Sequence, residues 1–177
     1  SYTTVIRGIP ELLIIYLVFF GAGQLMRNVA ALFGYTEYID LPIFVTGMIC
    51  IGASSGAYST EVIRGAVLAV PKGQLEAAKA VGMSRMMMFW RILAPQTARF
   101  ALPGLGNVWQ VTLKETALIS VIGLADVMRK ASEGAGSTKE PFTFYLTAAV
   151  VFYLITKVSG RGFFFAENWS NKGVRRA

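Results

Sequence analysis

Polar and charged residues interrupt an apolar stretch at 100–125, and they are the first candidates for chemistry in this sequence. The five that stand out are Asn107, Gln110, Lys114, Glu115 and Thr116. A charge at the centre of a membrane helix costs roughly 2.5–3.5 kcal/mol, whereas a leucine or isoleucine returns only about 0.3–0.6 kcal/mol. Ionisable groups at such positions usually face a pathway or a partner. The chemistry they could provide is hydrogen bonding and charge for a polar solute.

Helical spacing divides these residues between two faces. Asn107, Gln110 and Lys114 fall at i, i+3 and i+7, so they share one face. A second polar stripe lies beside it and contains Thr112, Glu115, Thr116 and Ser120. Either stripe could line a translocation pathway, or Lys114 and Glu115 could contact neighbouring helices or a partner subunit in a structural role. Adjacent residues on a helix do not face each other, so these two are not expected to pair.

The composition indicates a membrane protein. The chain has 177 residues, 54% hydrophobic and 15% charged, with a mean hydropathy of +0.53, whereas soluble domains carry about 25% charge. Because a helix needs about 20 mostly apolar residues to cross a bilayer, we expect an all-α, polytopic transmembrane helical bundle. Its four predicted spans are the apolar blocks 9–33, 41–60, 100–125 and 141–166.

Several functional classes are disfavoured by what the sequence lacks. The chain has one cysteine, Cys50, and no histidine, which excludes a disulfide framework, histidine catalysis and most zinc sites. It has no phosphate-binding Gly-x-x-x-x-Gly-Lys-[Ser/Thr] motif. Glu115 is the only acidic residue deep in a predicted span, so a membrane-embedded enzyme would lack a carboxylate pair. We therefore expect neither catalysis, nor a metal, nor a cofactor in this chain.

The distribution of charge predicts the topology. The net charge is +7, and the positive-inside rule explains it better than nucleic-acid binding does. The polar stretch 61–99 has six basic residues against two acidic ones, so it should be cytoplasmic, as should the basic tail. The acidic link 34–40 should lie outside. The link 126–140 would also be outside although it contains Arg129, Lys130 and Lys139, against the rule.

The second block is rich in small residues. Gly52 and Gly56 lie on one helix face, where two backbones could approach closely, or the glycines could simply be tolerated in a membrane. Both interpretations lead to a helix that should pack against protein and not against lipid.

The cytoplasmic stretch 61–99 has an internal pattern of its own. Good helix formers run over 74–81 and end at Gly82. Ser84 can cap a second helix, which runs through three methionines, Phe89 and Trp90 to Pro95. Such a surface suits a partner groove, and an amphipathic helix on the bilayer surface is the alternative.

These residues resemble the EAA loop found in permease subunits of binding-protein-dependent ABC importers. That motif is a Glu-Ala-Ala triplet, a glycine four residues after its last alanine, and an Ile-x-Leu-Pro ending. Its counterparts here are Glu76, Ala77, Ala78, Gly82, Ile92 and Pro95, with Ala94 in place of the usual leucine. The segments Arg7-Gly8-Ile9-Pro10 and Val70-Pro71-Lys72-Gly73-Gln74 are similar to the polar amino-acid branch of that family, which serves histidine, lysine, arginine, ornithine and opines. The resemblance weakens after about residue 156.

The resemblance implies a function and a set of partners. The loop would be the coupling element that sits in a groove of a separate ABC ATPase subunit, with Glu76 providing charge at the contact and Gly82 providing the turn. A second permease subunit, identical or homologous, and a periplasmic amino-acid-binding protein would complete the assembly in the bacterial inner membrane. The family usually has one more span before 9–33, so the sequence is expected to be N-terminally truncated. A passive channel or a non-transport membrane scaffold is the alternative, although neither needs such a loop.

Overall fold

The structure is a computed structural model that describes residues 2–32 and 42–171, and the regular elements within those ranges are all helical. The all-α prediction is therefore confirmed. The predicted outside link 34–40 and the basic residues at 172–177 lie outside the described residues.

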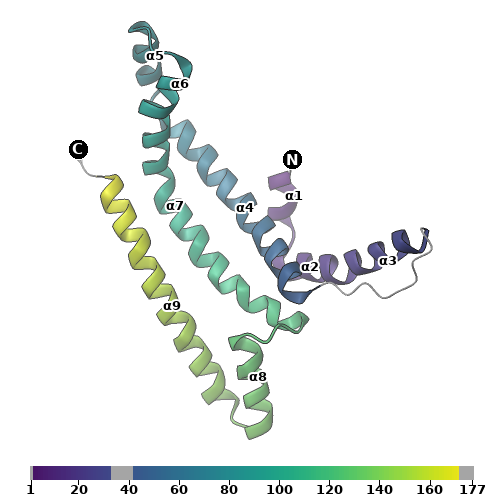
Figure 1. Ribbon diagram of the computed structural model, residues 1–177. Coiled ribbons are helices and arrows are strands. Elements are labelled where there is room, and N and C mark those ends of the chain that lie inside the picture. The colour runs from purple at the N-terminus through teal and green to yellow at the C-terminus, as the bar shows by residue number, and fades with distance from the viewer. Residues whose placement is uncertain (1, 33–41, 172–177) are drawn as a thin grey trace.

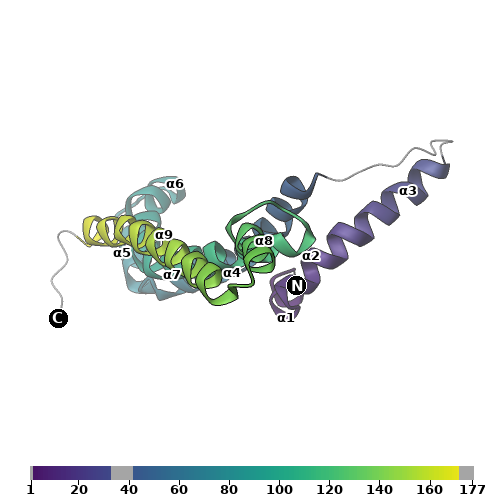
Figure 2. The ribbon, with the colours of Figure 1, turned by 90° about the horizontal axis from the view of Figure 1, so that it is seen from below.

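Three long helices lie side by side and form the body of the molecule. They are α4 (Ile43–Ala69), α7 (Ala94–Glu115) and α9 (Pro141–Ser170). α4 packs against α7, and α7 packs against α9, as Figures 1 and 2 show from two directions. The short helices α5 (Lys72–Ala80) and α6 (Arg85–Met88) lie at one end of this body, and α8 (Val127–Thr138) lies at the other.

Two helices, α4 and α9, are each long and apolar enough to cross a membrane. The N-terminal segment makes a third candidate if its bent pair of helices counts as one span. α7 has 22 residues but is not in this group, because Arg99, Asn107, Gln110 and Lys114 lower its hydropathy. Four spans therefore remain a prediction. In that prediction α7 crosses the membrane because its contacts with α4 and α9 shield it from lipid.

The N-terminal block is not the single continuous helix over 9–33 that the hydropathy predicts. α1 (Tyr2–Gly8) and the helix that starts at Glu11 are inclined by 103°. Pro10 has an extended conformation, with φ −57° and ψ 134°, and a proline also disfavours helical geometry at the residue before it. The helix continues through α2 (Glu11–Tyr16), a π-helical segment (Leu17–Ala22) and α3 (Gly23–Leu32), which projects from the body in Figure 1.

The stretch predicted as a loop, 61–99, is shorter in the structure. α4 continues to Ala69 and α7 begins at Ala94, so only 70–93 connects the two long helices. The second predicted helix is also not a separate element. α6 passes through a π-helical turn, Phe89–Leu93, directly into α7. Helical propensity at both ends of the loop extends the membrane helices beyond the apolar blocks.

The link 126–140 contains the helix α8, which packs against α9. Asp126 caps α8, since its Oδ1 accepts a hydrogen bond of 2.8 Å from the Arg129 N–H. Glu133 accepts hydrogen bonds from both Lys130 (2.8 Å) and Arg129 (3.2 Å). These bonds hold the pKa of Glu133 below its usual value. Two of the three cations that go against the positive-inside rule are therefore paired with an acid.

The buried core lies where the N-terminal segment crosses α4 and the end of α7. Ile14, Ile15, Cys50, Ile119 and Ile122 form one cluster. The last two belong to a 3₁₀ segment, Thr116–Ile122, which ends at Gly123 with φ +105°. A left-handed residue at this point favours glycine and turns the chain toward α8.

Close helix approaches occur at different glycines from those predicted. Gly52 has no neighbour within 4 Å of its Cβ position, and Gly56 meets only the Tyr2 hydroxyl. Instead, Ile119 packs directly onto Gly47, and Val62 packs onto Gly104. α4 packs against protein along one face, where Thr46, Cys50, Ser54 and Ala57 are buried, but the Gly52/Gly56 pair does not provide the contact. Its other face is exposed, at Phe44, Met48 and Ile49, so the prediction holds for one side of the helix.

We expect Gly104→Ala to destabilise the subunit and Gly52→Ala to leave it unchanged or slightly more stable. A Cβ at Gly104 would lie 2.7 Å from Val62 Cγ1, and overpacking of this kind costs about 1–3 kcal/mol. At the open Gly52 position, alanine gains helix propensity of about 0.5–1 kcal/mol. Unfolding in detergent, followed by circular dichroism, measures both. Equal stability of the two variants would contradict the close α4–α7 packing.

Candidate functional site

The loop between α4 and α7 is built around a left-handed glycine. Gly82 has φ +76°, and two backbone hydrogen bonds close the end of α5 across it. The Met83 N–H donates to the Ala78 oxygen and the Gly82 N–H donates to the Lys79 oxygen, both at 3.0 Å. This is the Schellman arrangement, in which glycine is favoured because it has no Cβ. The predicted turn at Gly82 is therefore confirmed.

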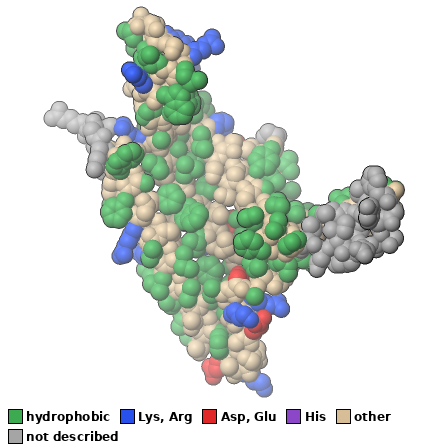
Figure 3. All heavy atoms as spheres, in the orientation of Figure 1, with side chains coloured by type: hydrophobic (Ala, Val, Ile, Leu, Met, Phe, Trp, Pro, Cys, Tyr) green, Lys and Arg blue, Asp and Glu red, His purple; other side chains and the backbone are tan. Residues whose placement is uncertain are grey.

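The chain after Gly82 is directed into the next helix by a cap. Ser84 Oγ accepts a hydrogen bond of 3.3 Å from the Met87 N–H, as predicted. The following turn exposes four large apolar side chains, those of Met86, Met87, Phe89 and Trp90. In Figure 3 apolar and basic side chains gather at the tip formed by α5 and α6.

The residues of the Glu-Ala-Ala triplet face in different directions. Ala78 is buried, whereas Glu76 and Ala77 are exposed. The Gln96 side-chain amide donates to Gln74 Oε1, which ties α5 to the start of α7. Ile92 is half-buried and Pro95 is exposed. The tip is thus held by Ala78 and Gln74, and it presents the Glu76 carboxylate outward.

Asn107 and Gln110 lie at the α7–α9 contact. Both line a small pocket together with Gly160 and Phe163. An ideal Cβ on Gly160 would lie 3.6 Å from Gln110 Nε2, so the glycine allows the amide to approach α9. Lys114 is exposed and does not line this pocket. The predicted Asn107–Gln110–Lys114 face is therefore divided by the packing of α9.

Glu115 lies on the opposite side of α7, toward the N-terminal segment. It lines a narrow gap with Glu11, Cys50 and Ser54, which we call the Glu11–Glu115 gap. The gap has no room for a water molecule. The sequence argument that no second carboxylate accompanies Glu115 is wrong, because the bend at Pro10 brings Glu11 to the same place. Glu11 lies just inside the apolar block 9–33, and this position is the sequence signal that could have marked it.

The other predicted pathway residues are separate from this gap. Thr116 is exposed, and its hydroxyl donates to the Leu113 oxygen of its own helix at 2.7 Å. Lys114 and Glu115 form no ion pair with each other in the described part of the chain, as expected. The five predicted residues therefore do not converge on one point.

A polar cluster joins α1 to α4 beside the gap. The Tyr58 hydroxyl donates to Glu11 Oε1 at 3.2 Å, and the Arg7 guanidinium lies 5.3 Å from the Tyr58 ring centroid. One turn further along α4, Arg64 donates to Glu61 Oε2 at 2.6 Å. Arg7, Tyr58, Glu61 and Arg64 line an open cavity of about 510 Å³. The Glu11–Glu115 gap therefore has a wide polar cavity next to it.

Metal chemistry finds no support in the described residues, where no group of three or more histidine, cysteine, aspartate or glutamate side chains could hold an ion. The arrangement instead combines apolar helices, polar groups between them and an ordered loop at one end. These features are typical of a polytopic helical membrane protein with a polar interior.

The chain belongs to the family described as the inner membrane component of binding-protein-dependent transport systems, whose model matches residues 1–164. It is similar to the nopaline transport system permease protein NocQ of Agrobacterium fabrum, with 66% identity over 98% of this chain and 74% of the relative. It is 56% identical to the octopine transport system permease protein OccQ of Rhizobium meliloti, over 99% of this chain and 74% of that protein.

More distant relatives extend the same pattern. The histidine/lysine/arginine/ornithine transport system permease protein HisQ of Escherichia coli is 44% identical over the whole of this chain and 77% of its own length. Among solved structures, a crystal structure of an amino acid ABC transporter with histidines matches with a TM-score of 0.77 and 34% identity. That match covers 95% of this chain and 73% of the other. The resemblance to importer permeases is confirmed.

We expect Gly82→Leu to impair transport without preventing membrane insertion. A leucine in the left-handed region costs about 1–2 kcal/mol. Since 1.4 kcal/mol corresponds to a factor of ten in an equilibrium constant, the population of the native loop conformation should fall about ten-fold. Gly73→Leu is the matched control, because Gly73 is exposed in α5 and has open space at its Cβ position. Solute uptake and subunit content of purified membranes are the measurements. Loss of insertion, or equal effects of both substitutions, would contradict a role specific to this turn.

Proposed function

We propose that this chain is the permease subunit of an ABC importer and translocates polar amino acids across the bacterial inner membrane, with the loop at 70–93 coupling it to a separate ATPase. The observation that carries the proposal is the geometry of the EAA loop, in which the Schellman turn at Gly82 leaves Glu76 exposed at the tip. Membership of the binding-protein-dependent family supports a multi-pass inner-membrane location.

The proposed assembly has three kinds of partner besides membrane lipid. An ABC ATPase subunit would receive the loop, a second permease subunit, identical or homologous, would complete the pathway, and a periplasmic amino-acid-binding protein would deliver the solute. The exposed Met86, Met87, Phe89 and Trp90 support the first of these contacts, since such side chains fit a partner groove. ATP hydrolysis is assigned to the ATPase and not to this chain. Nucleic acid is not expected as a partner.

The Glu11–Glu115 gap favours a solute that carries positive charge. Two carboxylates that line a gap without room for water repel each other, and a cationic group between them would relieve that repulsion. The relatives' names include histidine, lysine, arginine and ornithine, which have cationic or protonatable side chains. We therefore assign Glu11 and Glu115 to the pathway. Of the other predicted residues, Asn107 and Gln110 lie at the α7–α9 contact, and Lys114 and Thr116 are exposed.

The gap is closed in this conformation, which fits a transport cycle. A pathway that alternates between two openings must be sealed at some point, and Ile15, Cys50 and Ile51 surround the carboxylates here. The polar cavity beside Arg7 and Tyr58 would admit solute once α1 and α4 separate. Because Tyr58 donates to Glu11, movement of α4 would also change the surroundings of that carboxylate.

The first test is capture of the ATPase by the loop. We expect wild-type full-length permease to co-purify with its ATPase from detergent and Glu76→Lys to bind it at least about 30-fold more weakly. Reversal of a charge at an interface leaves its partner unpaired and costs about 2–5 kcal/mol. Glu140→Lys is the control, because Glu140 is also exposed but lies beyond α8, at the other end of the molecule.

Two results would contradict this part of the proposal. Failure of the wild-type protein to capture any ATPase would favour a passive channel or a non-transport scaffold. Equal loss in the Glu76 and Glu140 variants would mean that the effect is general and does not arise from the loop.

The second test addresses the pathway. We expect Glu115→Gln to lower uptake of radiolabelled arginine by about 10–100-fold, since a hydrogen bond to a charged group contributes roughly 1.5–3 kcal/mol. The isosteric change keeps the packing around Cys50 and Ile15. Lys114→Met, one residue away on the exposed side of α7, tests the alternative stripe in the same assay.

The two variants separate the possible pathways. Normal uptake by Glu115→Gln would remove the Glu11–Glu115 gap from the pathway. Normal uptake and assembly of Lys114→Met would remove Lys114 and leave it a structural or surface residue.

A further inference from the structure

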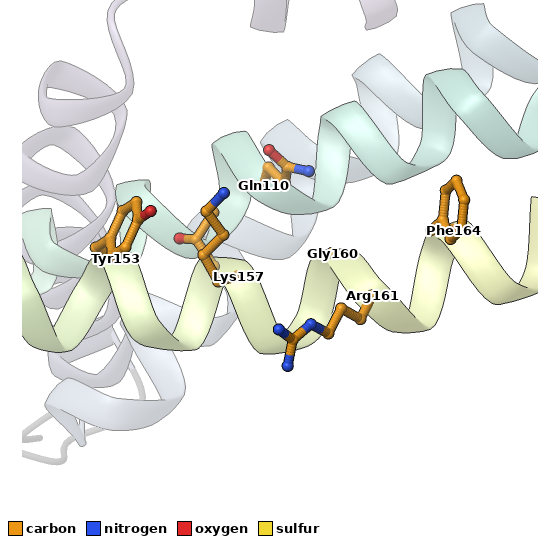
Figure 4. A pocket seen from close by; sticks show the side chains of 7 residues that line it. Gln110, Tyr153, Lys157, Gly160, Arg161 and Phe164 are labelled. Atoms are coloured by element: carbon orange, nitrogen blue, oxygen red, sulfur yellow. The ribbon is translucent and has the colours of Figure 1, made fainter.

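The groove between α7 and α9 contains two cations that the proposed transport function does not use. Lys157 and Arg161 lie one turn apart on α9 and line a cavity of about 460 Å³ with Gln110, Tyr153 and Thr156. In Figure 4 Lys157 points from α9 toward Gln110 on α7, and Arg161 extends along α9 in the direction of Lys157. The groove therefore combines two positive charges, an amide and two hydroxyls.

Neither cation is neutralised by an acid. Within the described residues, the ion pairs involve only Arg64, Arg129 and Lys130 as cations. Lys157 instead contacts the Tyr153 ring, whose centroid lies 5.4 Å from Nζ. A charge inside or near a bilayer normally finds a partner, so the groove requires an anion from elsewhere.

Helix contacts place these cations at the level of the lipid headgroups. Val62, the neighbour of Glu61 on α4, packs onto Gly104 of α7, and Phe163 of α9 packs onto Gly106 of α7. The first charges of α4 are therefore level with the region of α9 around Phe163. These charges lie toward the basic end of the molecule, where α5 and α6 are found. With the loop in the cytoplasm, as the proposed function requires, Arg161 is expected at the cytoplasmic boundary of the hydrocarbon.

The length of α9 leads to the same position. Arg161 is 20 residues after Pro141, which corresponds to about 30 Å at 1.5 Å per residue and matches the thickness of the hydrocarbon core. Lys157 is one turn deeper, and its side chain can reach back to the interface. The surface beside the groove is apolar, with Leu154, Ile155 and Val158 exposed on α9.

From these observations we propose that the α7–α9 groove binds the phosphate headgroup of an anionic phospholipid from the cytoplasmic leaflet. Lys157 and Arg161 neutralise the phosphate, Gln110 donates a hydrogen bond to it, and the acyl chains lie along the exposed apolar face of α9. Basic pockets between membrane helices on the cytoplasmic side have the charge and shape for such headgroups. A protein helix in the same groove would need to bring two carboxylates into the bilayer interface, whereas a phospholipid carries its anion at that depth.

Trp109 provides a local probe for the experiment. It precedes Gln110, is 46% exposed, and its ring lies 6.4 Å from that of Phe163. The full-length permease, assembled in its transporter, is reconstituted in phosphatidylcholine vesicles that contain brominated phosphatidylglycerol or brominated phosphatidylcholine. Subtraction of the fluorescence of a Trp109→Phe sample isolates the signal of this residue.

We expect brominated phosphatidylglycerol to quench Trp109 at much lower mole fraction than brominated phosphatidylcholine. Each cation near the surface contributes about 1 kcal/mol toward anionic lipid, so two give a preference of about 30-fold. Lys157→Gln/Arg161→Gln should abolish the preference and retain the quenching by brominated phosphatidylcholine, which also shows that the groove is still folded. Arg129→Gln/Lys130→Gln removes the same two residue types from α8, at the other end of the molecule from α5 and α6, and it should retain the preference.

Three outcomes would overturn the proposal. Equal quenching of the wild type by both lipids would mean that the groove does not select an anion. Quenching by neither would mean that protein covers the groove. Loss of the preference on addition of inorganic phosphate would identify a soluble anion as the ligand. None of these readouts depends on solute uptake, so failure of the lipid site and failure of the proposed transport function are distinguishable.

Discussion

The packing of α4 against α7 is the contact on which the other elements depend. Gly104 beneath Val62 permits it, and Gly47 beneath Ile119 permits the adjoining contact of α4 with the 3₁₀ segment that follows α7. Each glycine allows a branched side chain to rest on a helix backbone. In a bilayer there is little hydrophobic gain from helix association, so close van der Waals contact at small residues must hold helices together. This pair fixes the base of the coupling loop, because α4 leads into α5 and α7 receives the chain after α6. It also positions Glu115 opposite the N-terminal segment and presents the other face of α7 to α9.

The bend at Pro10 is the second constraint, and its consequence is functional. A straight helix from Tyr2 to Leu32 would carry Glu11 away from α7, whereas the 103° change of direction brings it beside Glu115. The same bend places Arg7 over Tyr58 and allows Tyr58 to donate to Glu11. Proline removes one backbone donor and disfavours helix at the preceding residue, so a local property of one residue creates a juxtaposition between groups about a hundred positions apart in sequence.

Features that depend on local sequence were predicted well, and those that depend on packing were not. The turn at Gly82 and the cap at Ser84 follow from residue type and periodicity, and the structure contains both. Of the four apolar blocks, the second and fourth correspond to α4 and α9, which are long and apolar enough to cross a membrane. The ends of α4 and α7 were misplaced, because helical propensity continues beyond the apolar residues that define a block. Gly52 and Gly56 do lie in one helix, α4, and Asn107, Gln110 and Lys114 lie in another, α7, so the helical spacing was predicted correctly. Which neighbour each face meets is decided by tertiary contacts, and the Glu11–Glu115 pair could not be found without them.

The three polar regions of the molecule differ in how their charges are balanced, and this difference separates their roles. At the α8 end, Glu133 accepts from both Arg129 and Lys130, so that region is largely self-neutralised and suits a fixed structural element. The Glu11–Glu115 gap has an excess of negative charge and is dry, a combination that favours a transient cation over a resident one. The Lys157–Arg161 groove has an excess of positive charge at the depth of the headgroups, where phosphate is permanently present. A solute pathway on one side of α7 and a lipid contact on the other would then use opposite charges, so the lipid phosphate and a cationic solute would not compete for the same groups.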